Sequence, residues 1–174
     1  KITKPFITID PDDAKDLDDA IYIEADNSKN NRGGVVLFVG ISDVSFFVKP
    51  NSIIDREALK RGNSTYFPDK VIPMLPEDLS NNLCSLKENS PKKAVVVKMH
   101  LDHRGYKIKH EFIRGIITVK KNYTYETFET YLSDNETKKK YSEYKRALNI
   151  LKQSPHLKNR LNLNLAEKKI TFSS

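Results

Sequence analysis

The chain has 174 residues, of which 38% are hydrophobic and 30% are charged, and its net charge is +7. This length supports one domain with a hydrophobic core, and the apolar share is too high for a disordered polypeptide. Apolar runs such as VVLFVGI are strand length, well below the ~20 residues of a membrane helix. The start, KITKPF, lacks the apolar stretch of a signal peptide, and the single cysteine, Cys84, excludes an internal disulfide. We therefore expect a cytoplasmic protein that makes no membrane contact.

The charge is unevenly distributed along the chain. Residues 1–86 have 10 Lys and Arg against 14 Asp and Glu, a balance of −4, whereas residues 87–174 have 20 against 9, a balance of +11. Such a distribution suits a protein that acts on a polyanion. One part of the protein would hold the polyanion, and the other part would attack it through a metal. Ordinary solvated basic faces are the alternative that composition leaves open.

The first predicted elements are strands on either side of an acidic loop. The run Phe6–Ile9 is rich in β-forming residues, Pro11 interrupts it, and residues 20–24 resume the alternation of a strand. The composition of residues 27–34, NSKNNRGG, is typical of a turn, and residues 35–44 favour another strand. The pattern predicts a β-hairpin with carboxylates at its entry.

The middle of the chain is irregular. Residues 55–61 favour a short helix that Gly62 ends. The three prolines of residues 63–76 exclude a regular helix or an interior strand, so we expect a rigid, ordered loop with an aromatic residue in it. A second short helix is predicted to begin at Pro76.

The last third predicts a long hairpin followed by helices. Residues 93–102 and 106–119 have strand patterns on either side of a turn, and the pattern becomes helical after Tyr125. Residues 161–165 and 169–172 favour short strands. The second helix presents one apolar face, made of Tyr141, Tyr144, Leu148 and Leu151. The pattern as a whole predicts an α+β fold, a mostly antiparallel β-sheet with flanking helices.

The stretch FITIDPDDAKDLDDAI, residues 6–21, indicates the chemistry. It sets six carboxylates against the single cation Lys15, namely Asp10, Asp12, Asp13, Asp16, Asp18 and Asp19. Carboxylates this crowded raise one another's pKa unless a cation binds among them, and hard oxygen ligands favour Mg²⁺ or Mn²⁺. Ala14 and Lys15 stand where a calcium-binding EF-hand loop needs Asp or Asn and Gly, which excludes that motif. A solvated acidic turn remains the structural alternative. Two ions ~4 Å apart would suit hydrolysis of a phosphodiester.

The same stretch resembles the signature of the ribonuclease II/ribonuclease R family of bacterial 3′-to-5′ exoribonucleases. The following residues, from VGISDVSFF to SNNLCSL, resemble the next blocks of the family's RNB catalytic domain in the same order, and they are closer to ribonuclease R than to ribonuclease II. The resemblance implies a metal-dependent hydrolase, with Mg²⁺ or Mn²⁺ as cofactor, that takes single-stranded RNA from its 3′ end and releases nucleoside 5′-monophosphates. It implies no membrane partner, and we expect a monomer.

The resemblance also implies site residues. Four aspartates match the catalytic, metal-binding carboxylates, namely Asp10, Asp16, Asp18 and Asp19, whereas Asp12 and Asp13 fall where the family varies. Tyr66 matches an aromatic that packs on a base near the 3′ end, and Tyr125 matches a tyrosine that places the terminal nucleotide and favours RNA over DNA. Asp43 matches a second-shell carboxylate. From the residues alone, Tyr66 plugs the proline-rich loop, Tyr125 is an ordinary aromatic at a helix start, and Asp43 is equally a strand-end cap.

The chain departs from the family pattern at several points. Phe46 and Phe47 stand where a His-Tyr pair is common, Asn122 replaces a basic residue, and SPKK lacks the usual acidic-basic pair. We interpret residues 1–174 as a partial RNB catalytic domain, without its C-terminal part and the flanking OB-fold RNA-binding domains. We therefore expect the fragment itself to be inactive. The alternative is a non-catalytic RNA-binding or regulatory module that keeps the same fold.

Overall fold

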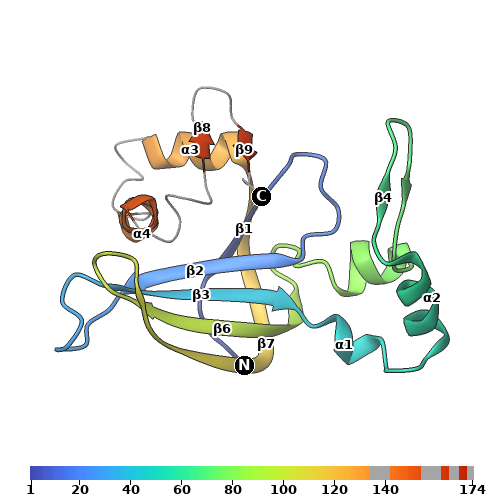
Figure 1. Cartoon of the computed structure of the whole chain (residues 1–174), viewed down its shortest axis with the longest axis horizontal. Helices are drawn as coiled ribbons and strands as arrows, with labels where there is room; N and C mark the ends of the chain where they lie inside the picture. Colours follow the sequence, from blue (N-terminus) through green and yellow to red (C-terminus); the bar gives the residue numbers. More distant parts are fainter. Residues whose placement is uncertain (134–141, 154–161, 165–168, 172–174) are drawn as a thin grey trace. The chain divides into compact units, whose positions relative to one another are not determined.

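The computed structural model describes residues 1–133, 142–153, 162–164 and 169–171. Five strands are hydrogen-bonded in the order β1-β2-β3-β6-β7 and close into a barrel (Figure 1). Closure leaves none of these five strands as an open edge. Their bounds are β1 Phe6–Asp10, β2 Asp19–Ala25, β3 Val35–Ser42, β6 Pro91–Leu101 and β7 Lys107–Thr124.

The predicted strands and both hairpins are confirmed, and so is the α+β class. Strands β2 and β3 are neighbours, as are β6 and β7, and β1 pairs antiparallel with β2. The pair that closes the barrel departs from the antiparallel pattern, because β1 and β7 run parallel, with Asp10 opposite Thr124. Two strands so distant in the chain share no turn, so no local pattern could have predicted this pairing.

Clustering of contacts divides the chain into two compact units. The first comprises Lys1–Tyr22, Val39–Val97 and Phe112–Phe128. Its innermost side chains include Phe6, Leu86, Val96 and Ile117, each at most 1% exposed. Gly40 faces them, and a Cβ built there would lie 3.0 Å from the Ile117 Cδ1, so close packing favours glycine at this position.

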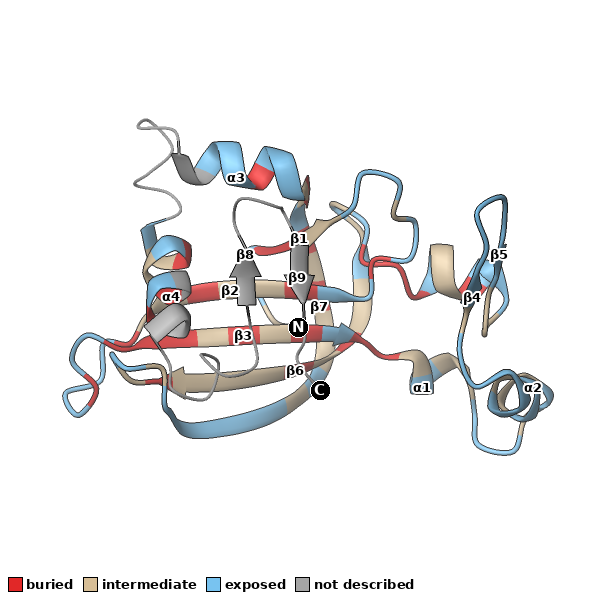
Figure 2. Cartoon of the chain, turned by 45° about the horizontal axis from the view of Figure 1, so that its top comes forward, coloured by how far each residue is buried: buried red, intermediate tan, exposed pale blue. Residues whose placement is uncertain are grey.

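The first unit also carries the short elements between β3 and β6. These are α1 (Val44–Phe47), α2 (Ile53–Arg61), the paired strands β4 (Thr65–Tyr66) and β5 (Val71–Ile72), and a π-helix, η1 (Leu79–Leu83). The predicted helix at 55–61 begins two residues earlier, where Ser52 accepts a hydrogen bond from the Asp55 N–H, and it ends at Gly62, whose φ is 74°. Figure 2 shows that α2, β4 and β5 are largely exposed.

The proline-rich segment has no interior strand, as predicted, but it contains one short two-stranded ladder that was not predicted. Thr65 and Tyr66 pair antiparallel with Ile72 and Val71. Pro68 lies in the connecting turn and Pro73 follows the last paired residue, so neither proline removes a hydrogen bond from this short ladder.

The second unit comprises Ile23–Phe38, Lys98–Glu111 and Glu129–Ser174. Its helix α4 (Ser142–Gln153) buries Tyr144, Ala147 and Ile150, which are spaced three residues apart on one face. The prediction of an apolar face is thus confirmed at Tyr144. Tyr141 and the side chains of Leu148 and Leu151 lie outside the described residues.

The remaining elements agree with the predicted pattern. Helix α3 spans Tyr125–Ser133, and β8 (Asn162–Asn164) pairs antiparallel with β9 (Lys169–Thr171). Leu161, Leu165 and Phe172, which the prediction placed in these strands, lie outside the described residues. In the part of the chain that the structure describes, no helix is long and apolar enough to cross a membrane.

Candidate active site

The four aspartates that the resemblance selects lie around one loop of the first unit. Asp10 is the last residue of β1 and Asp19 is the first residue of β2, while Asp16 and Asp18 lie in the connection between these strands. As predicted, this connection contains no helix or strand. Because β1 and β2 are antiparallel, the end of one strand and the start of the other meet at the same edge of the barrel.

The segment that follows η1 holds the second half of this loop. The Ser85 hydroxyl donates to the Lys15 carbonyl at 2.8 Å and accepts from the Leu17 N–H at 3.3 Å, and the Leu86 N–H donates to the Leu17 carbonyl at 2.8 Å. On the other side, the Ser42 N–H donates to the Asp18 carbonyl at 2.8 Å. Leu17 and Ser85 are buried. The backbone that carries Asp16 and Asp18 is therefore fixed, although both side chains are exposed.

The carboxylates of this loop disfavour one another's ionisation. Partial burial raises the pKa of Asp10, and the charges of Asp18 and Asp16 raise it further, while a hydrogen bond from Thr8 opposes the shift. Burial also raises the pKa of Asp19, as do the charges of Asp18 and Asp10. Asp10 thus lies within electrostatic range of the other three aspartates, and Asp19 lies within range of Asp18.

One oxygen of Asp10, the Oδ2 atom, is buried without a hydrogen-bond partner in the described part of the chain. A buried carboxylate oxygen without a partner is costly. Among the described residues, no three or more His, Cys, Asp or Glu side chains lie close enough together to hold a metal ion. The loop is therefore a set of repelling carboxylates, of a chemistry that hard cations prefer, and not a closed ligand cage.

A polar network that the sequence analysis missed supports Asp10. The Asn122 Nδ2 donates to the Thr8 hydroxyl at 2.9 Å and to the Leu86 carbonyl at 3.1 Å, and its Oδ1 accepts from the Glu88 N–H at 2.8 Å. Because the Thr8 hydroxyl accepts from Asn122, its own hydrogen is available to the carboxylate of Asp10. The departure at Asn122 thus has a structural role, as an amide that links three segments.

Asp43 is a fully paired carboxylate. It lies at the start of α1, only 3% exposed, and accepts two hydrogen bonds from Arg114, at 2.5 and 3.0 Å, and one from the Ser45 hydroxyl at 2.8 Å. The Arg114 guanidinium holds the pKa of Asp43 below its usual range. No sequence pattern pointed to Arg114, which lies 71 residues away. The second-shell role of Asp43 stays a prediction.

The two tyrosines of the predicted RNA site are both exposed, Tyr66 by 69% and Tyr125 by 55%. Tyr66 lies in β4, and this exposure contradicts its interpretation as a plug of the proline-rich loop. Tyr125 directly follows Thr124, the residue that pairs with Asp10 across the β1–β7 ladder, so it begins α3 next to the carboxylate loop. Asp12 and Asp13 are exposed in the turn between Pro11 and Ala14.

The ring of Phe46, at the first departure from the family pattern, lies close to two lysine ammonium groups. The Nζ atoms of Lys93 and Lys49 lie 4.5 and 5.3 Å from the centre of its ring, and Phe47 packs against it edge to face at 5.1 Å. Where the family commonly has a polar His-Tyr pair, this chain thus has an aromatic pair, and one ring of that pair binds two ammonium groups through cation–π contacts.

Comparison with protein families decides the relationship. The family model described as "RNB domain" matches residues 2–173. The chain belongs to the RNB family. Ribonuclease R of Buchnera aphidicola is 38% identical over 161 residues, which are 92% of this chain and 22% of that protein. The curated relatives that the chain matches are about five times longer than the region it spans.

Solved structures agree with this assignment. Mycoplasma genitalium RNase R, in a structure described as a complex with ribose methylated single-stranded RNA, superposes with a TM-score of 0.80 at 30% identity, over 93% of this chain and 26% of that one. Yeast Ssd1, described as a pseudonuclease, matches with a TM-score of 0.62 at 21% identity, over 74% of this chain and 15% of that one. At that identity the likeness shows the fold alone.

Proposed function

We propose that this chain carries the carboxylate part of the active site of a metal-dependent exoribonuclease. The parent protein would hydrolyse single-stranded RNA from the 3′ end and release nucleoside 5′-monophosphates. The observation that carries the proposal is the gathering of Asp10, Asp16, Asp18 and Asp19 around one fixed loop, with an unpartnered buried oxygen on Asp10. Membership of the RNB family, with several ribonuclease R relatives, supports the choice of reaction.

The proposed cofactor is Mg²⁺, with Mn²⁺ as the substitute. The four aspartates would hold two such ions, because their oxygens are the ligands that these ions prefer and because their mutual repulsion is relieved by positive charge. When bound, divalent ions supply charge neutralisation at the phosphodiester and a lowered pKa for the attacking water. Thr8 and Asn122 orient the Asp10 carboxylate, and Ser85 and Ser42 keep Asp16 and Asp18 at a fixed distance from it.

Two exposed aromatic side chains would handle the RNA. Stacking of a base on an aromatic ring is worth ~1–3 kcal/mol and tolerates any base, which suits an enzyme that degrades RNA of every sequence. Tyr66 offers such a ring in β4. Tyr125 would position the terminal nucleotide at the carboxylates, and the β1–β7 register supports this role because Tyr125 directly follows Thr124, the residue that pairs with Asp10.

The proposal is tested by Asp18→Asn in the full-length protein that contains this chain. We expect turnover of single-stranded RNA to fall at least ~100-fold, because a carboxylate that holds the metal is removed, while the dissociation constant for RNA changes little. Release of mononucleotides from labelled RNA in Mg²⁺ gives the rate, and fluorescence anisotropy in EDTA gives the affinity. Asp13→Asn is the matched control in the same loop and should keep wild-type rates. Normal turnover in Asp18→Asn would exclude the catalytic assignment.

A non-catalytic RNA-binding module is the second candidate, and the likeness in fold to a protein described as a pseudonuclease favours keeping it. The same assay separates the two functions, because such a module binds RNA and releases no nucleotide in Mg²⁺ or Mn²⁺. For the isolated chain, which spans about a fifth of its relatives' length, we expect little or no cleavage of 3′-labelled RNA. Rapid mononucleotide release by the isolated chain would contradict this part of the proposal.

A further inference from the structure

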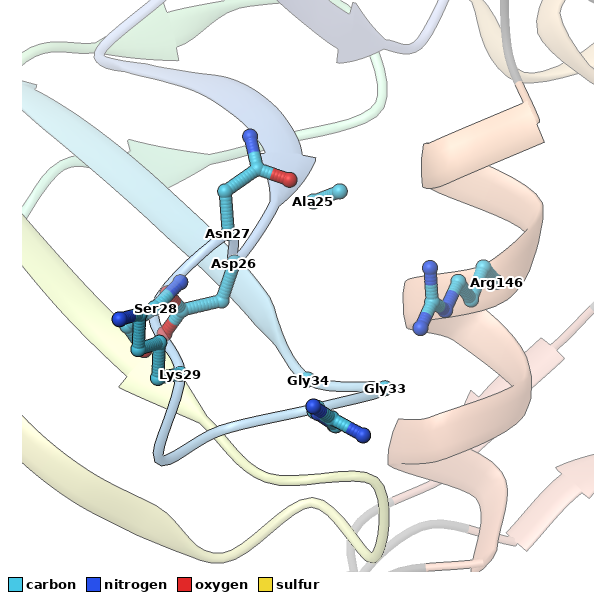
Figure 3. Close-up of a pocket in the computed structure, with 9 residues that line it drawn as sticks. Ala25, Asp26, Asn27, Ser28, Lys29, Gly33, Gly34 and Arg146 are labelled. Carbon is cyan, nitrogen blue, oxygen red and sulfur yellow. The ribbon is translucent and has the colours of Figure 1, made fainter.

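A pocket of about 370 Å³ lies in the second unit, and none of the predicted site residues lines it. The turn between β2 and β3 forms one side, and Arg146 of α4 forms the other (Figure 3). Figure 3 shows Arg146 on the side of its helix that faces Gly33 and Gly34. A Cβ built on Gly33 would lie 3.7 Å from the Arg146 Nη2, so the guanidinium is in contact distance of the turn.

The lining is strongly cationic. Lys29, Arg32 and Arg146 all contribute to it. Within the described part of the chain, Lys29 and Arg32 form no ion pair, whereas Arg146 pairs with Glu143 on its own helix at 3.7 Å. Cations gathered around a hollow repel one another, and an anion in the hollow relieves that repulsion.

The carboxylate in the lining, Asp26, does not neutralise the pocket cations. Its side chain is only 4% exposed, and its oxygens accept from the Asn31 Nδ2 at 2.8 Å and the Ser28 N–H at 3.0 Å and lie 2.7 Å from the His100 Nδ1. With its oxygens occupied by these groups, Asp26 fixes the turn and is unsuited to bind a metal ion. This arrangement makes a cation site unfavourable, and it leaves the exposed side chains of Lys29 and Arg32 and the half-buried Arg146 without an ion pair to Asp26.

The polar groups of the lining suit a phosphate group and not a nucleobase. Among the residues that the structure describes, no aromatic side chain lines the pocket, so the described lining offers no ring on which a base could stack. Ser28 and Asn27 add hydrogen-bonding side chains beside the cations, and Gly33, with φ of +86°, leaves the backbone of the turn open to close approach. Arginine pairs with phosphate oxygens through two parallel hydrogen bonds.

We propose that this pocket binds backbone phosphates of single-stranded RNA, as a binding site separate from the carboxylate loop. Asp19 begins β2 and Ala25, which lines the pocket, ends it, so one strand carries a residue of each site. The inference rests on the proposed function only for the choice of RNA as the polyanion. A pocket of this kind recognises the charge of the RNA backbone and not the base sequence. A protein that acts on RNA of any sequence requires such recognition.

The test compares two double variants of the full-length protein, Arg32→Gln with Arg146→Gln, and Lys109→Gln with Lys145→Gln as control. Lys109 and Lys145 are exposed, lie in β7 and α4 of the same unit, and do not line the pocket, so both variants remove two positive charges. Affinity for a fluorescent single-stranded RNA is measured by anisotropy in EDTA across a series of salt concentrations. EDTA keeps binding independent of cleavage.

We expect the pocket variant to weaken binding at 0.1 M salt by ~5-fold for each phosphate that is no longer neutralised, and to reduce the slope of log K against log salt by ~0.7 for each such phosphate. The control variant should change both quantities much less. Equal reductions of affinity in the two variants would show diffuse attraction by net charge and would overturn the inference, as would wild-type affinity in the pocket variant.

Calorimetry with inorganic phosphate and AMP distinguishes the source of the phosphate. If these small anions bind the wild type and bind the pocket variant more weakly, while RNA affinity is unchanged, the pocket holds free phosphate and the RNA assignment is wrong. If the pocket variant binds RNA more weakly in a protein that releases no nucleotide, the phosphate site stands and the proposed hydrolysis fails. Unchanged thermal midpoints in both variants exclude misfolding as the cause.

Discussion

Two pairs of aspartates in this protein have opposite surroundings. Asp26 and Asp43 are nearly inaccessible to solvent. Burial alone would raise the pKa of Asp26, but the hydrogen bond from Asn31 and its other hydrogen bonds outweigh burial and lower the pKa. Hydrogen bonds from Arg114 and Ser45 lower the pKa of Asp43. Asp10 and Asp19 face other carboxylates, and burial together with that repulsion raises their pKa values. The Oδ2 of Asp10 is buried without a donor in the described part of the chain.

The difference separates structure from function. A carboxylate that is fully hydrogen-bonded contributes to the fold, whereas one that is held among like charges weakens the fold and is retained for another reason. The same residue type thus stabilises the fold at Asp26 and Asp43 and is a candidate metal ligand at Asp10 and Asp19. Three experiments test this contrast.

Asp26→Ala should give the largest effect. It removes one of the two acceptors of the buried Asn31 amide, which keeps only the Leu101 carbonyl, and it removes the partner of the His100 Nδ1, so it should destabilise the second unit by about 2–3 kcal/mol. Hydrogen exchange followed by mass spectrometry on residues 23–38 should then be ~30-fold faster or more than in the wild type. Asp13→Ala, in an exposed turn, should leave the exchange of its own segment within about twofold. Equal protection from hydrogen exchange in Asp26→Ala and in the wild type would contradict the stabilising role of Asp26.

Acid should remove the advantage of the paired aspartates. Their folded pKa values lie below the unfolded value of about 3.9, so their contribution to stability is present above that pH and is lost as the pH falls through the folded values. The difference between the thermal midpoints of the wild type and of Asp26→Asn, measured between pH 6 and pH 3, should therefore be constant well above about pH 4 and should narrow progressively below it. A constant difference across that range would show that ionisation of Asp26 does not stabilise the fold.

Asp10→Asn should have the smallest effect and the opposite sign. Without divalent ions, removal of one repelling charge should stabilise the protein by about 0.5–1 kcal/mol, a rise of about 1–4 °C in the thermal midpoint. Mg²⁺ should raise the midpoint of the wild type by preferential binding to the folded state, and should raise that of Asp10→Asn less. If the variant is less stable in EDTA, or gains as much from Mg²⁺ as the wild type, Asp10 is not the repelled ligand proposed here.

Local pattern predicted most of the elements. The alternation in β2, β3, β6 and β7, the Gly62 stop of α2 and the helical texture after Tyr125 all lie within one stretch of chain, where side-chain period and backbone preference act directly. The parallel β1–β7 pair and the short β4–β5 ladder were not predictable. The first depends on contacts across more than 100 residues, and the second on hydrogen bonds that a proline count does not describe.

The types of residue in the candidate site were predictable from the sequence, whereas the residues that hydrogen-bond to them and hold them in place were not. Crowded aspartates indicated a cation, and the resemblance selected four of the six. Thr8, Ser85 and Arg114 carried no signal, and Asn122 was noticed only as a departure from the family pattern. Side chains of these types are common anywhere in a sequence and acquire their roles through partners that only the fold brings close. The three pocket cations likewise come from two segments that the chain separates by more than 100 residues.

The hydrogen bond between Thr8 and Asn122 spans 114 residues, and this separation sets an order of events during synthesis. At about 5–20 residues per second, a ribosome adds those residues in roughly 6–23 seconds. Until β7 emerges, β1 has no parallel partner and the hydroxyl of Thr8 has no amide to bind. The aspartates therefore leave the ribosome early, and the support that orients Asp10 is assembled only near the end of the first unit's synthesis.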